Sequence, residues 1–354
     1  MQAFRALRPD VRFFGIGGEL MRAEGAELLF DTQQTAIMGF VEVVKHYPFL
    51  REMFDTCERA FAARRPDAVL LIDYPGFNLR FAAKVKAAGG RVLYYISPQV
   101  WAWGKNRARK MRGLVDHLAC VFPFEEPLFT GLGVPTTFVG HPLAEILAHT
   151  DRHQFLSSLG ISDDQKVLGL FPGSRVQEIH RLLPTMLAGA EMLRTRTGCA
   201  VAIGAARLPG GIYAPYLRGH EHIHLVRGAT HALMEHSHAA IVASGTATVE
   251  TAWYGTPMVV VYRASWLNYQ IGRRLVNVEN IGMVNILAGR RIVPELLQDE
   301  LRADYILEFA LPYFADAARR AATIQELRRV RAMLGGPGAS QRTAEILDRM
   351  LPPT

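Results

Sequence analysis

Short apolar runs alternate with segments of helical periodicity along most of the chain. Runs this apolar are typical of strands covered on both faces, so they indicate a parallel sheet between layers of helices. Between two of the runs, apolar residues from Ile179 to Leu193 recur at the spacing of one helical stripe. The alternation therefore predicts a doubly wound α/β fold. The expected strands are residues 11–17, 68–73, 91–97, 117–123, 166–173, 200–205, 224–228, 239–245 and 257–263.

The alternation is interrupted between residues 142 and 165, where the chain is polar and lacks strand character. A length of 354 residues predicts two domains, at roughly 150 residues each. We expect one Rossmann-like domain over residues 1–150, a second over residues 151–302, and C-terminal helices over residues 303–354. The first domain opens on a helix, whereas the first strand of a doubly wound domain lies near the centre of its sheet. Either this domain begins in an unconventional way, or it lacks its first strand and the loop that follows it.

Composition narrows the class of protein further. Hydrophobic residues make up 49% of the chain and charged residues 21%, which excludes a disordered protein. The net charge of +7 allows an anionic partner but, spread over two domains, is too small to indicate nucleic acid. The three cysteines lie far apart, which disfavours a disulfide framework and fits a reducing cytosol. No apolar run reaches the length of a membrane span, and the polar, basic start of the sequence is unlike a signal peptide.

Two strand-to-helix turns in the second half are typical of phosphate sites. In the first turn, Gly173, Ser174 and Arg175 lead from the strand at 166–173 into a helix. Glycine lets a ligand approach the backbone, N–H groups at a helix start suit a phosphate, and arginine adds a fork of donors. An ordinary capped helix with a solvent-facing arginine is the alternative.

The second turn contains Ser244, Gly245 and Thr246, with Glu250 about one helical turn further on. Glu250 is placed to accept a hydrogen bond from a ribose hydroxyl. Capping by Ser244 or Thr246, with Glu250 balancing the helix dipole, is the alternative. Because ligands of open α/β sheets bind at the carboxyl ends of the strands, the two turns together predict a nucleotide diphosphate site.

The first half offers a carboxylate, a group of sugar-binding candidates and an apolar stretch. Asp73 ends the strand at 68–73 and is a candidate general base on a sugar hydroxyl, with a turn or capping role as the alternative. Beyond the strand at 91–97, an indole side chain suits the floor of a sugar site or completes a core. The stretch 38–54 is either core or an exposed patch with a basic rim that suits lipid. The sugar-binding candidates are Ser97, Gln99 and Trp101, and the lipid candidates are Val41, Val43, Val44, Tyr47 and Leu50.

We expect no metal site. No Asp-x-Asp pair is present to hold a metal on a diphosphate, so helix N-termini and Arg175 would neutralise its charge. Six histidines crowd into residues 220–238 and include His220, His222 and His224, which alternate along the sequence. The acidic residues near them in sequence are Glu221 and Glu235, so we expect a solvated edge rather than zinc.

Taken together, the motifs resemble those of the lipid-A-disaccharide synthase family. In the family's order, between residues 11 and 300, stand MGFVEV, IDYPGFN, YYISPQVWAW, VFPFE, FVGHPL, LFPGSRVQEI, ASGTATVE, PMVVVYR and NILAGR. The resemblance implies two Rossmann-like domains facing a cleft, the glycosyltransferase-B fold. It implies an inverting, metal-independent hexosyltransferase without a cofactor. Such enzymes move 2,3-diacylglucosamine from UDP to the 6-hydroxyl of 2,3-diacylglucosamine 1-phosphate (lipid X) and release UDP.

The resemblance also implies roles for individual residues. Asp73 and Arg175 match positions that are essential in the family, and Asn285 matches an asparagine implicated in binding. Many members have a second aspartate where this chain has Gly76, so the role of base falls on Asp73 alone. Members also begin with a strand and a G-E-x-S-G-D loop before the first helix, which this sequence lacks. A truncated form or a misplaced start codon is the hypothesis that this departure suggests.

The implied partners are UDP-diacylglucosamine, lipid X and the inner-membrane surface, without nucleic acid. The implied location is cytoplasmic and peripheral, on the inner face of the inner membrane, and the oligomeric state is open between a monomer and a homodimer. Three rival functions remain: another type-B UDP-sugar transferase, a UDP-sugar epimerase, and a degenerate paralogue that binds UDP-sugar without turnover. Release of UDP only when acylated acceptor is present separates these rivals from the implied activity.

Overall fold

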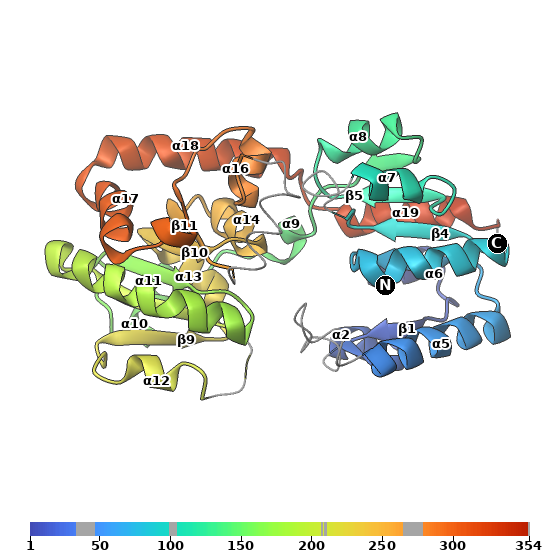
Figure 1. Cartoon of the computed structure of the whole chain (residues 1–354), viewed down its shortest axis with the longest axis horizontal. Coiled ribbons are helices and arrows are strands. Elements are labelled where there is room, and N and C mark those ends of the chain that lie inside the picture. The colour runs from blue at the N-terminus through green and yellow to red at the C-terminus, as the bar shows by residue number, and fades with distance from the viewer. Residues whose placement is uncertain (33–46, 99–104, 207, 209–210, 265–278, 353–354) are drawn as a thin grey trace. The chain divides into compact units, whose positions relative to one another are not determined.

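The structure is a computed structural model that describes residues 1–32, 47–98, 105–206, 208, 211–264 and 279–352 (Figure 1). The chain divides into two compact units. The first comprises Met1–Ala144 together with Gly336–Thr354, and the second comprises Glu145–Gly335. The short helix α9 (Leu143–Ile146) lies at the boundary. The helical segment expected over residues 303–354 is therefore divided between the two units.

The second unit is built on six parallel strands in the order β12-β11-β10-β7-β8-β9. In this sheet, β8 and β9 lie on one side of β7, and β10, β11 and β12 lie on the other side. The direction in which successive strands are added to the sheet therefore reverses between the neighbours β7 and β10. This place is the switch point of a doubly wound sheet. The predicted fold class is confirmed in this unit. The strands are β7 (Val167–Phe171), β8 (Ala200–Ala205), β9 (Ile223–Arg227), β10 (Ala239–Ala243), β11 (Met258–Tyr262) and β12 (Glu295–Leu297).

Helices cover both faces of this sheet (Figure 1). Helices α11 (Val176–Thr197) and α17 (Ala303–Ala315) pack on each other and on one face, where the predicted stripe from Ile179 to Leu193 is buried. Gly204 faces the other side and lies against Thr230, at the start of α13. The remaining helices are α10 (Arg152–Ser158), α12 (Ala214–Leu217), α13 (Thr230–His236), α14 (Thr246–Trp253), α16 (Met283–Ala288), η1 (Gln298–Glu300) and α18 (Ala317–Met333).

The first unit contains two separate parallel sheets. One has four strands in the order β3-β4-β5-β6, and the other pairs β1 with β2. Strand β3 is an edge of the larger sheet, and Leu70 and Ile72 on it are 38% and 44% exposed. The carboxyl end of this edge strand presents Asp73. The strands are β1 (Phe14–Gly17), β2 (Glu27–Asp31), β3 (Val69–Ile72), β4 (Val92–Tyr95), β5 (His117–Cys120) and β6 (Thr136–Phe138).

The four-stranded sheet is also covered on both faces. Leu71, Val92 and Tyr94 pack with α5, α6 and α7, whereas Leu93 and Ala119 pack with the first and last helices of the chain. These two helices, α1 and α19, lie against each other. None of the described helices combines the length and apolar character that a membrane span requires. The helices of this unit are α1 (Gln2–Leu7), α2 (Glu19–Ala23), α5 (Tyr47–Arg64), α6 (Pro75–Ala87), α7 (Lys105–Met111), α8 (Glu125–Gly131) and α19 (Ala339–Met350).

Candidate active site

The two predicted phosphate-binding turns lie next to each other in the second unit. The first joins β7 to α11, and the second joins β10 to α14. Strands β7 and β10 are parallel, hydrogen-bonded neighbours, with Leu170 opposite Ile241. Because neighbouring strands are about 4.8 Å apart, both turns open on the switch-point crevice, where ligands of this fold bind.

In the first turn, Gly173 has a φ of +107°, a conformation that other residues rarely adopt. The turn closes round Glu178, and a Cβ at position 173 would lie 2.3 Å from Glu178 Oε2. The N–H groups of Ser174 and Arg175 donate to this oxygen at 3.0 and 3.3 Å, and Arg175 Nη1 donates to Oε1 at 3.1 Å. The donors predicted for a phosphate thus already hold an anionic group. The Arg175 side chain is 73% exposed and accessible to a ligand.

In the second turn, Gly245 has a φ of +146°, and Gly245 and Thr246 are exposed. The Thr248 hydroxyl donates to the Gly245 carbonyl at 2.8 Å, which fixes the start of α14. The Ser244 hydroxyl donates to the Ile281 carbonyl at 2.9 Å and so ties the turn to the segment before α16. The first N–H groups of a helix have no partner within it, so the exposed start of α14 suits an anionic ligand.

Glu250 lies in α14 with its Oε2 atom 3.6 Å from Nε2 of His231 on α13. Burial raises the pKa of Glu250, and the neighbouring His231 opposes that rise. A half-buried carboxylate in such a setting is a suitable acceptor for a sugar hydroxyl. The contact with ribose stays a prediction, and His231 is a neighbour that the sequence pattern did not indicate.

Asn285 is fully buried in α16, and its side chain is used by the protein itself. Its oxygen accepts from the N–H groups of Ile292 and Val293 at 2.8 and 3.0 Å. Its nitrogen donates to the Val293 carbonyl at 2.9 Å and to Glu295 Oε1 at 2.7 Å. Glu295, also buried, accepts from the N–H of Ile281 at 2.9 Å. Hydrogen bonds thus link Asn285 through Glu295 and Ile281 to Ser244 in the second turn. Its contact with a ligand stays a prediction.

Asn285→Ala is expected to lower the free energy of unfolding of the second unit by about 3 kcal/mol, because several buried polar groups lose their partners. Urea denaturation measures this loss. The control is Asn280→Ala, in which a partly exposed residue loses a single long hydrogen bond from Arg291. Wild-type stability together with loss of UDP binding in Asn285→Ala would instead mean that Asn285 touches the ligand.

In the first unit, the turn that carries Asp73 has an unusual backbone. Asp73 and Tyr74 have φ values of +46° and +42°, which non-glycine residues adopt at a cost. Asn78 Nδ2 donates to the carbonyls of Ile72 at 3.0 Å and Asp73 at 2.7 Å, and the Tyr94 hydroxyl donates to the Asp73 carbonyl at 2.6 Å. Burial raises the pKa of Asp73, while a hydrogen bond from the Tyr74 N–H opposes the rise. Strain held in place by buried partners is typical of a functional site.

Further polar side chains follow the next strands of this sheet. Ser97, after β4, is buried and donates its hydroxyl to Glu125, at the start of α8 after β5. His141, after β6, is buried, and its Nδ1 accepts from the Leu143 N–H at 3.2 Å. With Asp73 they follow the carboxyl end of each strand in turn, which makes this edge the candidate acceptor side. Glu125 and His141 are residues that the sequence analysis did not single out.

Several predicted residues lie outside the described part of the chain. These include two of the sugar-binding candidates, Gln99 and Trp101. Tyr47 begins helix α5, but its side chain is outside the described part, and Leu50 on α5 is partly exposed. The other lipid candidates, Val41, Val43 and Val44, lie outside the described residues.

Stability should depend on pH through His141. Burial lowers its pKa to about 4 from the ordinary 6.5, so between these values the unfolded chain binds the proton more readily. Stability of the first unit is therefore lost as the pH falls from 6.5 toward 4, by up to about 3 kcal/mol. His141→Gln should reduce this acid loss, measured as the fall in melting temperature between pH 7 and pH 4.5. The control, His153→Gln, replaces an exposed histidine, and an equal acid loss in all three proteins would contradict the prediction.

Comparison with known proteins agrees with the geometry. The chain matches the family model described as "Lipid-A-disaccharide synthetase" over residues 1–348. It is 43% identical over 349 residues to the lipid-A-disaccharide synthase of Geobacter metallireducens, covering 98% of this chain and 91% of the relative. The structure resembles the UDP-GlcNAc 2-epimerase of Neisseria meningitidis, with a TM-score of 0.63, 13% identity, and 96% and 100% of the two chains covered. It also resembles the kitacinnamycin glycosyltransferase, with a TM-score of 0.59, 15% identity, and 99% and 94% covered.

The two Rossmann-like units and the likeness to these solved structures define the fold class, the glycosyltransferase-B fold, which the transferase and the epimerase share. The matched family model and the long, near-complete similarity to curated relatives then settle the family. The chain belongs to the lipid-A-disaccharide synthase family and is a UDP-sugar-dependent glycosyltransferase.

Proposed function

We propose that this protein transfers 2,3-diacylglucosamine from UDP-2,3-diacylglucosamine to the 6-hydroxyl of 2,3-diacylglucosamine 1-phosphate (lipid X). The observation that carries the proposal is the pair of glycine-containing turns on neighbouring strands at the switch point of the second unit. Membership of the family supports the choice of sugar. The Neisseria epimerase, whose structure holds UDP-GlcNAc, supports a UDP-sugar on this fold.

The second unit binds the donor. The diphosphate takes the place of the Glu178 carboxylate at the N–H groups of Ser174 and Arg175, and the Arg175 guanidinium turns from Glu178 to the phosphate. These donors stabilise the charge that grows on the departing UDP, without a metal ion. Gly245 and Thr246 supply the second set of N–H groups, and Glu250 accepts from the ribose.

The first unit binds the acceptor near Asp73. As the 6-hydroxyl oxygen of the acceptor forms a bond with C1 of the donor sugar, the bond from C1 to the phosphate oxygen breaks. The hydroxyl proton passes to the Asp73 carboxylate, and UDP leaves with the electron pair of the broken bond. Attack on the face opposite UDP inverts the anomeric centre. Ser97 contributes by holding Glu125 beside the same edge of the sheet.

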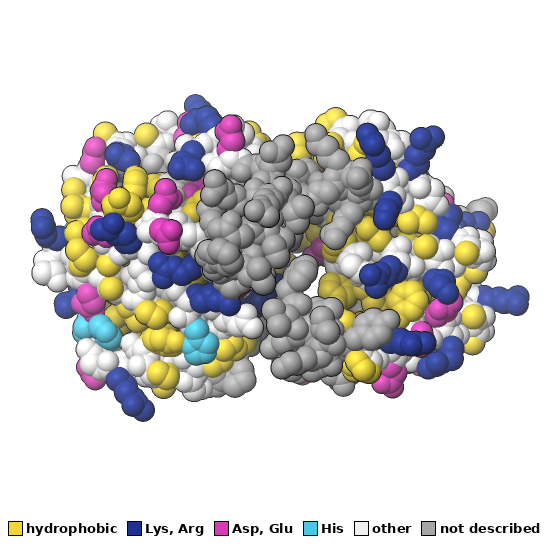
Figure 2. All heavy atoms as spheres, in the orientation of Figure 1, with side chains coloured by type: hydrophobic (Ala, Val, Ile, Leu, Met, Phe, Trp, Pro, Cys, Tyr) yellow, Lys and Arg dark blue, Asp and Glu magenta, His cyan; other side chains and the backbone are white. Residues whose placement is uncertain are grey.

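A basic face of the first unit supports a location at an anionic membrane surface. Lys and Arg side chains gather on this unit in Figure 2 over α6 and α7, the helices labelled there in Figure 1. Exposed members are Arg80 on α6, Arg109 and Lys110 on α7, and Arg112 just after it. Such a cluster is attracted to anionic lipid headgroups. It fits the proposed place at the inner face of the inner membrane, with Leu50 and the stretch 38–54 as the lipid contact.

The test is release of UDP by the purified chain with UDP-2,3-diacylglucosamine, with and without lipid X. Production of UDP and of the acylated disaccharide only when both substrates are present supports the proposal. Turnover of UDP-GlcNAc to its epimer, without acceptor, would favour the epimerase. Binding of UDP by calorimetry without any product would favour the degenerate paralogue.

A further inference from the structure

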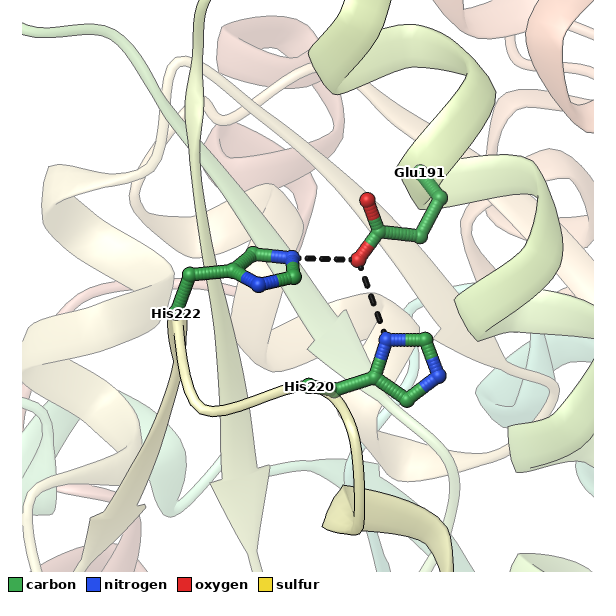
Figure 3. A group of neighbouring side chains, drawn as sticks. All are labelled: Glu191, His220 and His222. Carbon is green, nitrogen blue, oxygen red and sulfur yellow. Dashed lines mark hydrogen bonds and ion pairs between the residues drawn. The ribbon is translucent and has the colours of Figure 1, made fainter.

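Three side chains converge near the amino end of β9, and together they have the composition of a metal site. Glu191 comes from α11, while His220 and His222 come from the segment between α12 and β9 (Figure 3). Glu191 Oε1 lies 2.5 Å from His222 Nε2 and 3.2 Å from His220 Nδ1. One atom from each residue lies within 4.8 Å of the other two. Both imidazole rings therefore point at the same carboxylate oxygen.

The protein holds these groups in place before any ligand arrives. Arg194 Nε donates to the other oxygen of Glu191 at 2.8 Å, which leaves Oε1 to the histidines. The histidine segment is fixed by backbone bonds from the N–H of His220 to the Leu217 carbonyl at 3.0 Å, and from the N–H of Ile223 to the His220 carbonyl at 2.9 Å. The Glu191 carboxylate is thus oriented toward both imidazole rings by contacts within the protein.

We propose that Glu191, His220 and His222 bind a divalent transition-metal ion, with zinc as the reference ion. Two imidazole nitrogens and one carboxylate oxygen are a common zinc ligand set, with water in the fourth position. Ligand atoms around tetrahedral zinc, at bonds of about 2.0–2.1 Å, are about 3.3 Å apart. The Glu191 to His220 separation already matches this spacing, and the Glu191 to His222 separation needs to widen by about 0.8 Å.

The bound ion acts on structure rather than on sugar transfer. Glu191 follows Arg175 by 16 positions on the same helix, which places them about 24 Å apart along it. His222 precedes β9, at the end of the sheet opposite the nucleotide turns. The ion joins the C-terminal third of α11 to the segment that leads into the edge strand β9. It therefore stabilises the second unit without touching UDP.

The position of Glu191, far from the two histidines in the sequence, explains why the sequence analysis did not predict this site. His220 and His222 have only Glu221 and Glu235 near them in sequence, and neither is the ligand. Glu191 lies 29 positions before His220 and is brought to it by the packing of α11 on the sheet.

The experiment is a calorimetric titration of the metal-stripped full chain with zinc chloride. The proposal expects one site per chain, and at least ten-fold weaker binding in His222→Ala and in Glu191→Gln, about the loss seen even for outer-shell metal partners. The control is His153→Ala, because His153 pairs with Asp163 on the surface and is not part of the three-residue cluster. This variant should bind zinc as the wild type does.

Thermal unfolding gives a second readout. Zinc at a hundred-fold excess over its dissociation constant should raise the melting temperature by about 5 °C in the wild type and in His153→Ala, and by much less in the two cluster variants. UDP binding should be unchanged in all four proteins. Equal zinc affinity in the wild type and both cluster variants, or no zinc binding by a folded wild-type chain, overturns the proposal. Because Glu191→Gln keeps the size of the side chain, it decides the matter if His222→Ala fails to fold.

Discussion

Asp73→Asn is expected to lower the turnover number by about 10²–10⁴-fold, the usual contribution of a general base. The amide has the shape of the carboxylate but does not take the proton of the acceptor hydroxyl. UDP binding should be unchanged, because the nucleotide turns lie in the other unit. The measurement is UDP release at saturating donor and acceptor, with calorimetry for UDP affinity.

The pH profile sharpens this prediction. Since burial raises the pKa of Asp73, the wild-type rate should fall as the pH is lowered through a value above that of an ordinary aspartate. This acid limb should be absent from the residual activity of Asp73→Asn. The matched control is Asp67→Asn, a change of the same kind at the loop that precedes β3. Wild-type turnover in Asp73→Asn would remove Asp73 from the role of base.

Arg175→Ala is expected to weaken donor binding and to lower turnover by about 10²–10³-fold, the loss found when one stabiliser of developing charge is removed. The guanidinium is exposed beside the N–H groups of Ser174 and Arg175, so its loss leaves the leaving diphosphate with backbone donors alone. Steady-state kinetics with varied donor measures both effects.

Two controls separate this role from a general effect of charge. Arg196→Ala removes the same charge from the opposite end of α11 and should leave kinetics unchanged. Arg175→Lys should recover part of the donor affinity but little turnover, because lysine lacks the planar fork that matches phosphate. Normal kinetics in Arg175→Ala would exclude its contact with the diphosphate.

The sequence predicted the strands and turns that carry the candidate site better than it predicted how those strands and turns pack together. Apolar runs identified five of the six strands in the sheet of the second unit and missed the short edge strand β12. The residues of both turns follow from where those runs stop. Chain order does not reveal that β10 lies beside β7 rather than beside β9. The placement of β10 beside β7, which brings the two turns together in one candidate site, results from the packing of the strands.

The residues that the sequence did not indicate are partners that folding brings from a distance. Glu295 reaches Asn285 across ten positions, Glu125 reaches Ser97 across 28, and Glu191 reaches His220 across 29. Asn285 is a further case, because its motif suggested contact with a ligand and did not indicate the four hydrogen bonds that its side chain makes within the protein. The spacing of residues along a chain indicates which of them share a face of a helix or strand. It does not indicate which buried polar group will form a hydrogen bond with a residue far away in the sequence.

The carboxylate of Glu178 has a consequence for the catalytic cycle. In the structure it accepts from the N–H groups of the Gly173 turn and holds that turn in shape without nucleotide. If the diphosphate displaces it as proposed, Glu178 is an internal competitor, and its return to the same N–H groups after sugar transfer favours the release of UDP. We therefore expect an enzyme with modest affinity for free UDP and rapid exchange of spent nucleotide for fresh donor.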